Sequence, residues 1–384
     1  MPRNESLIPL KTLLFSFHAT NTIMISFLPL YLSFKGLNGT EIGWVLAVGP
    51  LASIVSQPVW GYLSDKYKTV KWMIVICIIG FLLSSIVFFQ MEYLGYILLV
   101  GAILYFFSSP VGALADSLGQ RRADDLNVSF GTIRTWGSLG FALSALLIGE
   151  LLERTGIEYM VWPYVIIGSV ALLVSFRLTD VQVDTTPIRL SDVSKLLHNK
   201  TFVIFLTLMM FITITHRTND SFIGLYITSI GGSENLVGLA WFVGVFSEAI
   251  VFALGAFWFR KFPSLVFIII AGILYTFRWF LYATVNDPLF IIGLQVLHGL
   301  TFGVFYLAAF DFITRIIPKL LQATGHLIFY SVFFGISGII GSIGGGIILE
   351  HYSGGTLYVV IGCSSLIGTI SFIVFYLRQR RVTT

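Results

Sequence analysis

The chain is 384 residues long, of which 56% are hydrophobic and only 11% charged, and it carries a formal net charge of +4. Soluble domains carry about 25% charged residues, whereas here apolar stretches of about twenty residues recur along the whole length, with a mean hydropathy of +0.90. The composition excludes a soluble globular protein and indicates a polytopic membrane protein. In such a protein the small positive net charge is no evidence of nucleic-acid binding.

Twelve hydrophobic stretches follow one another, each long enough to cross a bilayer as a helix. Their predicted ranges are 10–33, 40–63, 70–90, 94–121, 127–152, 159–178, 201–229, 235–259, 264–283, 288–316, 321–349 and 355–378. One long polar connection, "TDVQVDTTPIRLSDVSKLLHNK", separates the sixth from the seventh, and we expect a short surface helix in it from Ser191 to His198. The sequence therefore predicts an all-α membrane protein with an N-terminal six-helix bundle (1–180), a cytosolic linker (181–200) and a C-terminal six-helix bundle (201–384).

The placement of basic residues predicts the orientation in the membrane. Of the 23 lysines and arginines, 18 fall on one set of loops and on the two ends, 2 (Lys35 and Arg154) on the opposite loops, and 3 within spans. Cytosolic loops carry the excess of lysine and arginine. We therefore expect a multi-pass protein of the inner (plasma) membrane of the cell, with both termini in the cytoplasm.

The fourth predicted span contains an isolated carboxylate. In "PVGALADSLG", Asp116 ends a long uncharged run, five residues before the next charge, Arg121. A lone ionised carboxylate in hydrocarbon is costly, so Asp116 is expected to have either a partner or a function.

The seventh predicted span carries the densest group of polar side chains. In "FITITHRTNDSF", the residues Thr213, His216, Arg217 and Asp220 recur at i, i+3, i+4 and i+7, which places them on one face of a helix. Charged residues on a spanning helix are expected to face the bundle interior. This face either lines a solute cavity or contains only a local ion pair between Arg217 and Asp220.

The two halves of the sequence repeat each other weakly. The stretch "GTEIGWVLAVG" in the second span matches "GSENLVGLAWFVG" in the eighth, and Asp116 matches Asp311, 195 positions later. Each half is therefore predicted to hold six helices of the same orientation. Parallel repeats of this kind indicate two bundles that move about a solute site between them.

The stretch "GYLSDKYKTVK", after the second span, resembles the signature of the major facilitator superfamily. Gly61, Asp65, Lys66 and Lys71 fit that pattern, and Lys68 stands where it prefers glycine. The resemblance implies a transporter that works by alternating access, not an enzyme. It also implies that Gly61, Asp65 and Lys66 belong to a gating loop on the cytosolic side, with Gly61 permitting a close approach of helices.

Two further stretches narrow the resemblance. "FGTIRTWGSLGFAL" (Phe130 to Leu143) and "HGLTFGVFYLAA" (His298 to Ala309) are similar to motifs of the proton symporters around lactose permease, the nucleoside permeases and the phenylpropionate transporter group. This resemblance implies proton-coupled import of a small polar organic solute such as a sugar, a nucleoside or an aromatic acid. The implied partners are that solute, protons and the lipid bilayer, and we expect a monomer.

The resemblance also assigns roles to single residues. In lactose permease an acidic residue on helix four and an arginine on helix five, eighteen residues later, hold the sugar, and Asp116 and Arg134 have that spacing. A carboxylate–guanidinium pair satisfies its own charges and leaves donors and acceptors for a solute. Together with His216, Arg217 and Asp220, this pair is the predicted solute-binding set. A purely structural salt bridge is the alternative interpretation.

Glu248, Arg278 and His298 resemble the proton-coupling residues of lactose permease on helices eight, nine and ten. Thr301 stands where that protein has its proton-carrying carboxylate, so Glu248 is predicted to take this role. The resemblance further implies that Arg278 pairs with Glu248 in one conformation and separates from it in another. Asp311 is a further candidate, although we favour a simple ion pair between Asp311 and Arg315, four residues on. His298 has the alternative of being a hydrogen-bonded histidine of the interior.

Two other classes of function are disfavoured by the sequence. Drug antiporters of the superfamily carry a glycine-rich motif with proline on helix five, and "GSLGFALSALLIGE" has the glycines without the proline, which disfavours proton-driven efflux. A membrane sensor or enzyme would need an extra domain or a catalytic cluster. We find in the sequence no nucleotide-binding loop, metal-spaced ligands or nucleophile triad, and we expect no cofactor and no metal.

Overall fold

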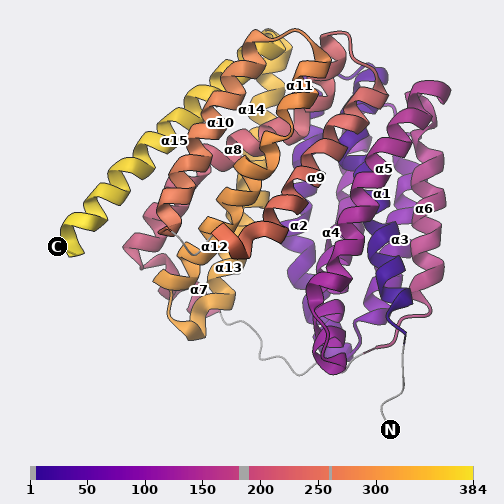
Figure 1. Ribbon diagram of the computed structural model, residues 1–384. Coiled ribbons are helices and arrows are strands. Elements are labelled where there is room, and N and C mark those ends of the chain that lie inside the picture. Colours follow the sequence, from indigo (N-terminus) through magenta and orange to yellow (C-terminus); the bar gives the residue numbers. More distant parts are fainter. Residues whose placement is uncertain (1–5, 181–189, 259–261, 384) are drawn as a thin grey trace. The chain divides into compact units, whose positions relative to one another are not determined.

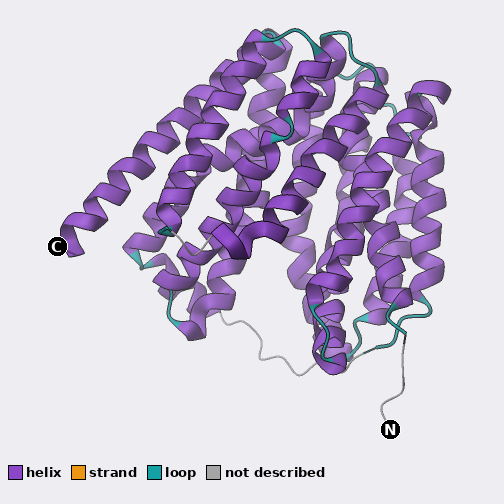
Figure 2. Cartoon of the chain, viewed as in Figure 1, coloured by secondary structure: helices purple, strands orange, loops and turns teal. Residues whose placement is uncertain are grey.

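The computed structural model describes residues 6–180, 190–258 and 262–383. Every regular element within these ranges is a helix, as Figure 2 shows. Twelve helical segments are long and apolar enough to cross a membrane. The predicted all-α membrane protein with twelve transmembrane helices is therefore confirmed.

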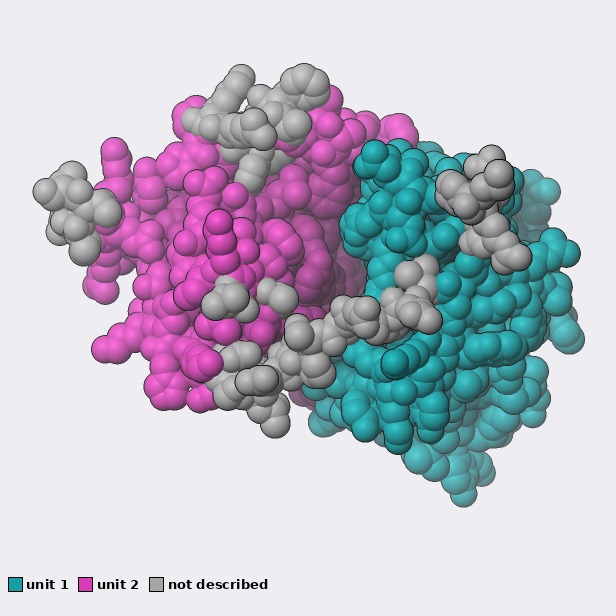
Figure 3. Space-filling view, turned by 90° about the horizontal axis from the view of Figure 1, so that it is seen from below, with its two compact units in different colours: residues 1–186, 233–242 teal, residues 187–232, 243–384 magenta. Residues whose placement is uncertain are grey.

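The chain divides into two compact units, which are coloured separately in Figure 3. Unit 1 comprises residues 1–186 and 233–242, and unit 2 comprises residues 187–232 and 243–384. Residues 233–242 are the first part of a helix whose remainder belongs to unit 2. The linker residues 181–189 lie outside the described residues, so the predicted boundary between the halves stays a prediction.

Unit 1 holds the first six spans (Figure 1). In chain order its elements are α1 (Ile8–Phe34), α2 (Gly39–Tyr67), α3 (Lys71–Phe88), α4 (Leu94–Leu126), α5 (Phe130–Thr155), the short η1 (Ile157–Met160) and α6 (Val161–Ser175). Helix α1 packs against α5 and α6, α2 packs against α4, and α3 packs against α4 and α6. The most extensive of these interfaces joins α1 to α5, which places the fifth span beside the first.

Unit 2 holds the linker helix and the last six spans. Its elements are α7 (Leu190–Leu197), α8 (Lys200–Ser229), most of α9 (Glu234–Trp258), α10 (Ser264–Thr284), α11 (Pro288–Leu294), η3 (Gly299–Gly303), α12 (Val304–Ile316), η4 (Lys319–Leu321), α13 (Gln322–Tyr330), η5 (Ser331–Ile336), α14 (Ser337–His351) and α15 (Gly354–Thr383). Helix α8 packs against α14 and α15, and α10 packs against α12 and α15. Helix α7 agrees within one residue at each end with the short helix expected in the linker.

Two spans of unit 2 contain π-helical turns. The tenth span runs from Pro288 to Ile316 and widens into the π-helix η3 at Gly299–Gly303. The eleventh contains the π-helix η5 at Ser331–Ile336. Such turns are rare and occur frequently at functional sites.

Local hydrogen bonds explain where several spans begin. Asn38 Oδ1 accepts from the backbone N–H of Glu41 at 2.9 Å, while Glu41 Oε2 accepts from the N–H of Asn38 at 3.0 Å, a capping box that starts α2. At the start of α3, Asp180 Oδ1 accepts from the N–H groups of Val70 and Lys71, at 3.0 and 3.2 Å. A carboxylate from the end of the sixth span thus caps the third span.

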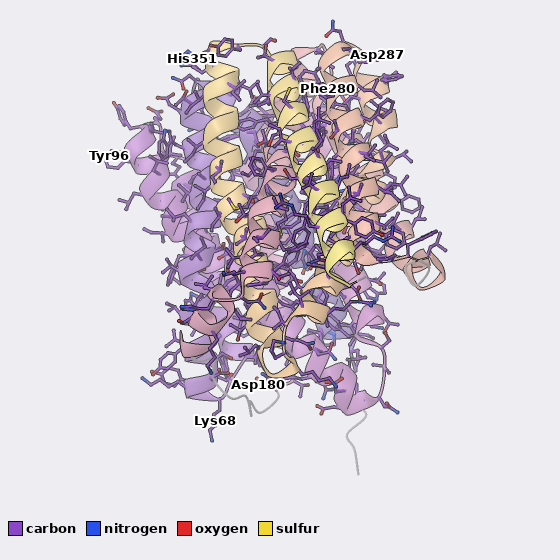
Figure 4. All side chains as sticks on the ribbon, turned by 90° about the vertical axis from the view of Figure 1, so that its left-hand side faces the viewer. Lys68, Tyr96, Asp180, Phe280, Asp287 and His351 are labelled. Atoms are coloured by element: carbon purple, nitrogen blue, oxygen red, sulfur yellow. The ribbon has the colours of Figure 1, made fainter. Side chains whose placement is uncertain are left out.

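The positions of the loops agree with spans that alternate in direction. Lys68, in the loop after α2, and Asp180 lie at the same end of unit 1, and Tyr96, at the start of α4, lies toward the other end (Figure 4). Asp287 and His351 likewise lie at one end of unit 2. Successive spans of each unit therefore run in alternating directions.

Large apolar side chains cover much of the outer surface. Leu83, Leu147 and Leu173 are 62%, 65% and 67% exposed, and many other aliphatic and aromatic residues of the spans exceed a third. Soluble monomers rarely expose contiguous apolar patches of this extent, and a bilayer removes such side chains from water. The surface therefore agrees with a multi-pass membrane protein.

Small residues allow the close contacts between helices. A Cβ placed on Gly140 of α5 would overlap the backbone carbonyl oxygen of Phe15 in α1. In unit 2, a Cβ on Gly341 of α14 would lie 2.8 Å from the hydroxyl oxygen of Thr218 in α8. Glycine at these positions lets backbones approach without a hydrophobic driving force.

We predict that Gly140→Ala destabilises the protein by about 1–3 kcal/mol, because α1 and α5 must move apart to admit the methyl group. Gly344→Ala is the matched control, since a Cβ on this glycine of α14 meets nothing within 4 Å. The control is expected to be neutral, or stabilising by up to about 1 kcal/mol. The thermal unfolding midpoint in detergent measures both, and equal midpoints for Gly140→Ala and the unaltered chain would contradict the close contact.

Candidate functional site

Ionisable side chains within the spans contact one another in both units. In unit 1, Arg134 Nε of α5 lies 3.2 Å from Asp116 Oδ1 of α4, so the structure brings the predicted pair together. The two side chains are 35% and 37% exposed. Both Asp116 Oδ1 and Arg134 Nη1 are nevertheless closed off from solvent, and Arg134 Nη1 has no hydrogen-bond partner within the described residues. The pair is therefore partly accessible and has hydrogen-bonding capacity to spare.

A third polar group, which the sequence analysis did not single out, lies beside this pair. His18 of α1 stands next to Arg134 over Gly137 of α5, and its Nε2 atom also lacks a hydrogen-bond partner within the described part of the chain. A single histidine in an apolar stretch has no periodicity to mark it. The one available signal was its polarity within the first predicted span, "FSFHATN".

In unit 2, the predicted polar face of α8 forms a compact charge group. Asp220 Oδ2 accepts from Arg217 Nη1 at 2.9 Å and lies 3.3 Å from His216 Nε2. The Tyr275 hydroxyl of α10 lies 3.1 Å from the other ring nitrogen of His216. His216 and Asp220 are buried, and Asp220 Oδ1 has no partner among the described residues. The Asp220 carboxylate thus contacts both an arginine and a histidine. The local ion pair between Arg217 and Asp220, considered from the sequence, is present.

Glu248 of α9 and His298, at the end of the tenth span's first segment, form a second ionisable contact in unit 2. His298 Nε2 lies 3.7 Å from Glu248 Oε2, with side chains 7% and 23% exposed. The backbones meet next to this contact, because a Cβ on Gly299 would overlap the carbonyl oxygen of Ser247 and the Gly299 N–H donates to Ser247 Oγ at 2.9 Å. This crossing fixes His298 opposite Glu248.

Aromatic stacking joins the two contacts of unit 2. The rings of His216 and His298 have centroids 5.4 Å apart. His216 also stacks on Phe302 of η3, with centroids 4.6 Å apart and planes 6° from parallel. The Asp220 and Glu248 carboxylates are thus linked through two neighbouring imidazole rings.

Arg278 of α10 has neutral partners instead of the expected carboxylate. It is fully buried and donates to the Thr301 hydroxyl at 3.2 Å, to the Tyr282 hydroxyl at 3.1 Å, and to Gln295 Oε1. Its guanidinium carbon also lies 4.9 Å from the ring centroid of Trp279. Among the described residues no carboxylate lies at ion-pairing distance of Arg278, and the ion-pair contact of Glu248 is with His298. Thr301, which replaces the carboxylate of lactose permease, is one of its acceptors.

Asp311 forms the ion pair that we favoured from the sequence. Arg315 Nε donates to Asp311 Oδ2 at 2.7 Å, four residues along the same helix, and the hydroxyl of Ser264 donates to the same oxygen. The Arg315 side chain is 72% exposed. These partners account for the carboxylate without a transport role.

The gating motif borders a small cavity in unit 1. Gly61 and Asp65 of α2 line a space of about 190 Å³ together with Ser117 and Arg121 of α4. A Cβ on Gly61 would meet nothing within 4 Å, so the expected close approach of a helix at this glycine is not observed within the described residues. Lys66 lies at the end of α2, with its amine 5.6 Å from the ring centroid of Tyr67.

The arrangement offers charge and hydrogen-bonding groups without a metal site. Within the described residues, no group of three or more His, Cys, Asp or Glu side chains is placed to hold a metal ion. The groups that are present can donate and accept hydrogen bonds, and they include a carboxylate and an imidazole 3.7 Å apart.

Comparison with known proteins relates this arrangement to membrane transporters. The family described as "MFS_1 like family" matches residues 7–360. The Uncharacterized transporter YwbF of Bacillus subtilis is 27% identical, with 92% of this chain and 89% of that protein aligned. The Maltose permease of Geobacillus stearothermophilus is 24% identical over 90% of this chain and 88% of its own, and the Probable 3-phenylpropionic acid transporter of Escherichia coli is 25% identical over 78% and 80%.

The fold is also similar to that of solved structures. The crystal structure of the nucleoside transporter NupG superposes with a TM-score of 0.86, covering 96% of this chain and 98% of that chain at 17% identity. At this identity the likeness concerns the fold alone. It agrees with two six-helix bundles of the major facilitator type.

We predict that Asp220→Asn destabilises the protein by about 3 kcal/mol, because it leaves the Arg217 charge and the His216 ring without their shared carboxylate. Asp311→Asn is the matched control, since Arg315 is largely exposed and such pairs contribute at most about 1 kcal/mol. Thermal unfolding of the two variants in the same detergent compares them. An Asp220→Asn midpoint no lower than that of Asp311→Asn would contradict the buried charge group.

Proposed function

The chain belongs to the MFS_1 like family, and from this premise we propose that it is a proton-coupled symporter that imports a small polar organic solute by alternating access. It is a multi-pass membrane transporter, and its relatives include the Sucrose permease of Escherichia coli besides the proteins compared above. We place it in the inner membrane as a monomer with both termini in the cytoplasm, and with its halves at 1–180 and 201–384 joined by the linker 181–200. The solute class, whether sugar, nucleoside or aromatic acid, is left open by this proposal.

The contact between Glu248 and His298 is the observation that carries proton coupling. A carboxylate and an imidazole 3.7 Å apart, both largely buried, need only a small approach to share or exchange a proton. An ionised carboxylate is costly in a site that closes without water. Protonation of Glu248 removes this cost, so proton and solute are loaded together before the change of conformation.

Arg278 takes a supporting role in this proposal. Its bonds to Gln295 and Thr301 connect the ninth and tenth spans around the turn that carries His298. It therefore keeps a positive charge near the coupling residues while it positions the His298 segment. This role differs from direct pairing with Glu248, which the resemblance implied.

The solute-binding role falls to the other charged groups. Asp116 and Arg134 in unit 1 are partly exposed and retain unused donors and acceptors. In unit 2, Arg217 and Asp220 with His216 offer a second polar surface. Gly61, Asp65 and Lys66 are assigned to the gating loop.

We predict that Glu248→Gln abolishes uphill uptake while it preserves downhill exchange. Proteoliposomes with an inward proton gradient are tested with labelled maltose, uridine and 3-phenylpropionate, and accumulation above the external concentration is measured. The amide cannot take up the proton, so accumulation of the transported compound falls to the equilibrated level. Asp311→Asn is the control and keeps accumulation because Arg315 and Ser264 account for that carboxylate.

Wild-type accumulation by Glu248→Gln would reject the coupling assignment. The proton gradient also tests the direction of transport. Import by symport needs acid outside the vesicles, whereas a proton-driven efflux antiporter reconstituted in the same way accumulates solute when the lumen is acid.

We predict that Asp116→Ala and Arg134→Ala each weaken binding of the transported compound by about 10- to 100-fold, the expected loss for a charged hydrogen-bonding partner. Binding is measured by ligand-dependent thermal shift on the purified chain. Arg315→Ala is the control, since this arginine is exposed and pairs with Asp311. Unchanged affinity in both unit 1 variants would leave the Asp116–Arg134 contact as a structural salt bridge.

A further inference from the structure

The crossing of α1 and α5 in unit 1 brings an unassigned histidine to the solute-binding pair. At Gly140 the two backbones are too close for a side chain against the Phe15 carbonyl. Further along the crossing, the Thr22 hydroxyl donates to the His18 carbonyl at 2.8 Å and to the Phe141 carbonyl at 3.2 Å. These contacts hold the stretch of α1 that carries His18 against the stretch of α5 that carries Arg134.

Gly137 provides the space in which the two side chains meet. A Cβ on this glycine would lie 2.5 Å from Arg134 Nη1 and 3.1 Å from His18 Nε2. Both nitrogen atoms therefore border one small region. The edge of the His18 ring is held by Phe17, whose ring centroid lies 5.4 Å away at an interplanar angle of 70°.

Three polar atoms around this region have unfilled hydrogen-bonding capacity. His18 Nε2 and Arg134 Nη1 are closed off from solvent and lack a hydrogen-bond partner within the described residues. Asp116 Oδ1 is also closed off, and its ion-pair contact with Arg134 Nε at 3.2 Å leaves it a second acceptor position. Leaving a buried donor or acceptor unpaired is destabilising, and native proteins do so rarely. These incompletely paired atoms, from three helices of one unit, indicate a place where another molecule supplies the missing groups.

We propose that His18 is a solute-contacting, specificity-determining residue, and that with Arg134 and Asp116 it binds the hydroxyl groups of a neutral polyhydroxylated solute. The inference rests on the proposed function and narrows its solute class. The side chains of Asp116 and Arg134 are about a third exposed, so the solute arrives at their open side. Rotation of the guanidinium or the imidazole then presents the unfilled atoms to it.

The chemistry of the three atoms favours hydroxyl groups over a carboxylate. A hydroxyl oxygen accepts from Arg134 Nη1 while its hydrogen goes to the unprotonated Nε2 of a neutral His18. A second hydroxyl donates to Asp116 Oδ1. A carboxylate can accept from Arg134, but it has no hydrogen for either acceptor, and the Asp116 charge repels it.

The test measures binding of four probes to the purified full chain: maltose, sucrose, uridine and 3-phenylpropionate. At least one of the three neutral hydroxylated probes is expected to raise the unfolding temperature, and 3-phenylpropionate is expected to have no effect. His18→Leu, which keeps the side-chain bulk without the nitrogen, weakens binding of that probe by about tenfold. His18→Gln places an amide near the position of Nε2 and restores affinity to within about threefold of the unaltered chain.

Recovery of affinity in His18→Gln distinguishes a contact between His18 and the solute from a role of His18 in packing alone. A structural role for His18 predicts that both variants change the unfolding temperature of the ligand-free protein and that Gln restores no affinity. If His18→Leu does not fold, His18→Asn, which shortens the reach of the amide, takes its place and is expected to bind more weakly than His18→Gln. Equal affinity in the Leu or Asn variant and the unaltered chain overturns the proposal, as does binding of 3-phenylpropionate alone or of none of the four probes.

Failure of this inference is distinguishable from failure of the proposed function. Accumulation of 3-phenylpropionate in proteoliposomes refutes the solute class and leaves symport intact. Binding of a hydroxylated probe that depends on His18, without flux of that probe in either direction, supports the inference and refutes transport.

Discussion

An ionised side chain inside a membrane span is stable only where protein groups replace the water that it has lost, and the interior of this protein is organised around that requirement. Charged side chains within the spans are compensated in three ways. Asp220 is compensated by an arginine and a histidine of its own helix. Arg278 is compensated by amide, hydroxyl and aromatic groups without a countercharge. The Asp116–Arg134 pair is compensated in charge but incompletely in hydrogen bonds.

Close contacts between helices make this compensation possible. Side chains from different spans meet only where the backbones come together, and in lipid small residues permit this. Gly140 sets the crossing that carries His18 to Arg134, and Gly299 sets the one that carries His298 to Glu248. Each of these two contacts therefore depends on a nearby glycine as well as on the ionisable residues themselves.

The sequence predicted those features that depend on local composition or on spacing along one helix. The twelve spans follow from apolar length, and the group at Arg217 and Asp220 follows from their separation by three residues. The Asp116–Arg134 contact could be predicted because a lone carboxylate in a span needs a partner and the family resemblance supplied one. These arguments use one element at a time or a known spacing between two.

The features that were missed depend on tertiary contacts between neutral or isolated residues. Asp180 caps α3 across more than a hundred residues of chain, and no pattern marks it. His18 has no periodic companion in the first span. The partners of Arg278 are neutral, and the family resemblance, which relates Arg278 to Glu248, gave no indication of Gln295. Gly61 fits a family signature, yet its surroundings in this structure are open.

The π-helical turn at Gly299–Gly303 has a geometric consequence for the span that contains it. Such a turn holds one residue more than an α-helical turn, and one residue corresponds to about 100° of rotation about the helix axis. A helical wheel drawn through His298 and Asp311 with uniform spacing therefore assigns the later residue to the wrong side. The angular register must be restarted at Val304, and the same correction applies beyond Ile336 in the next span.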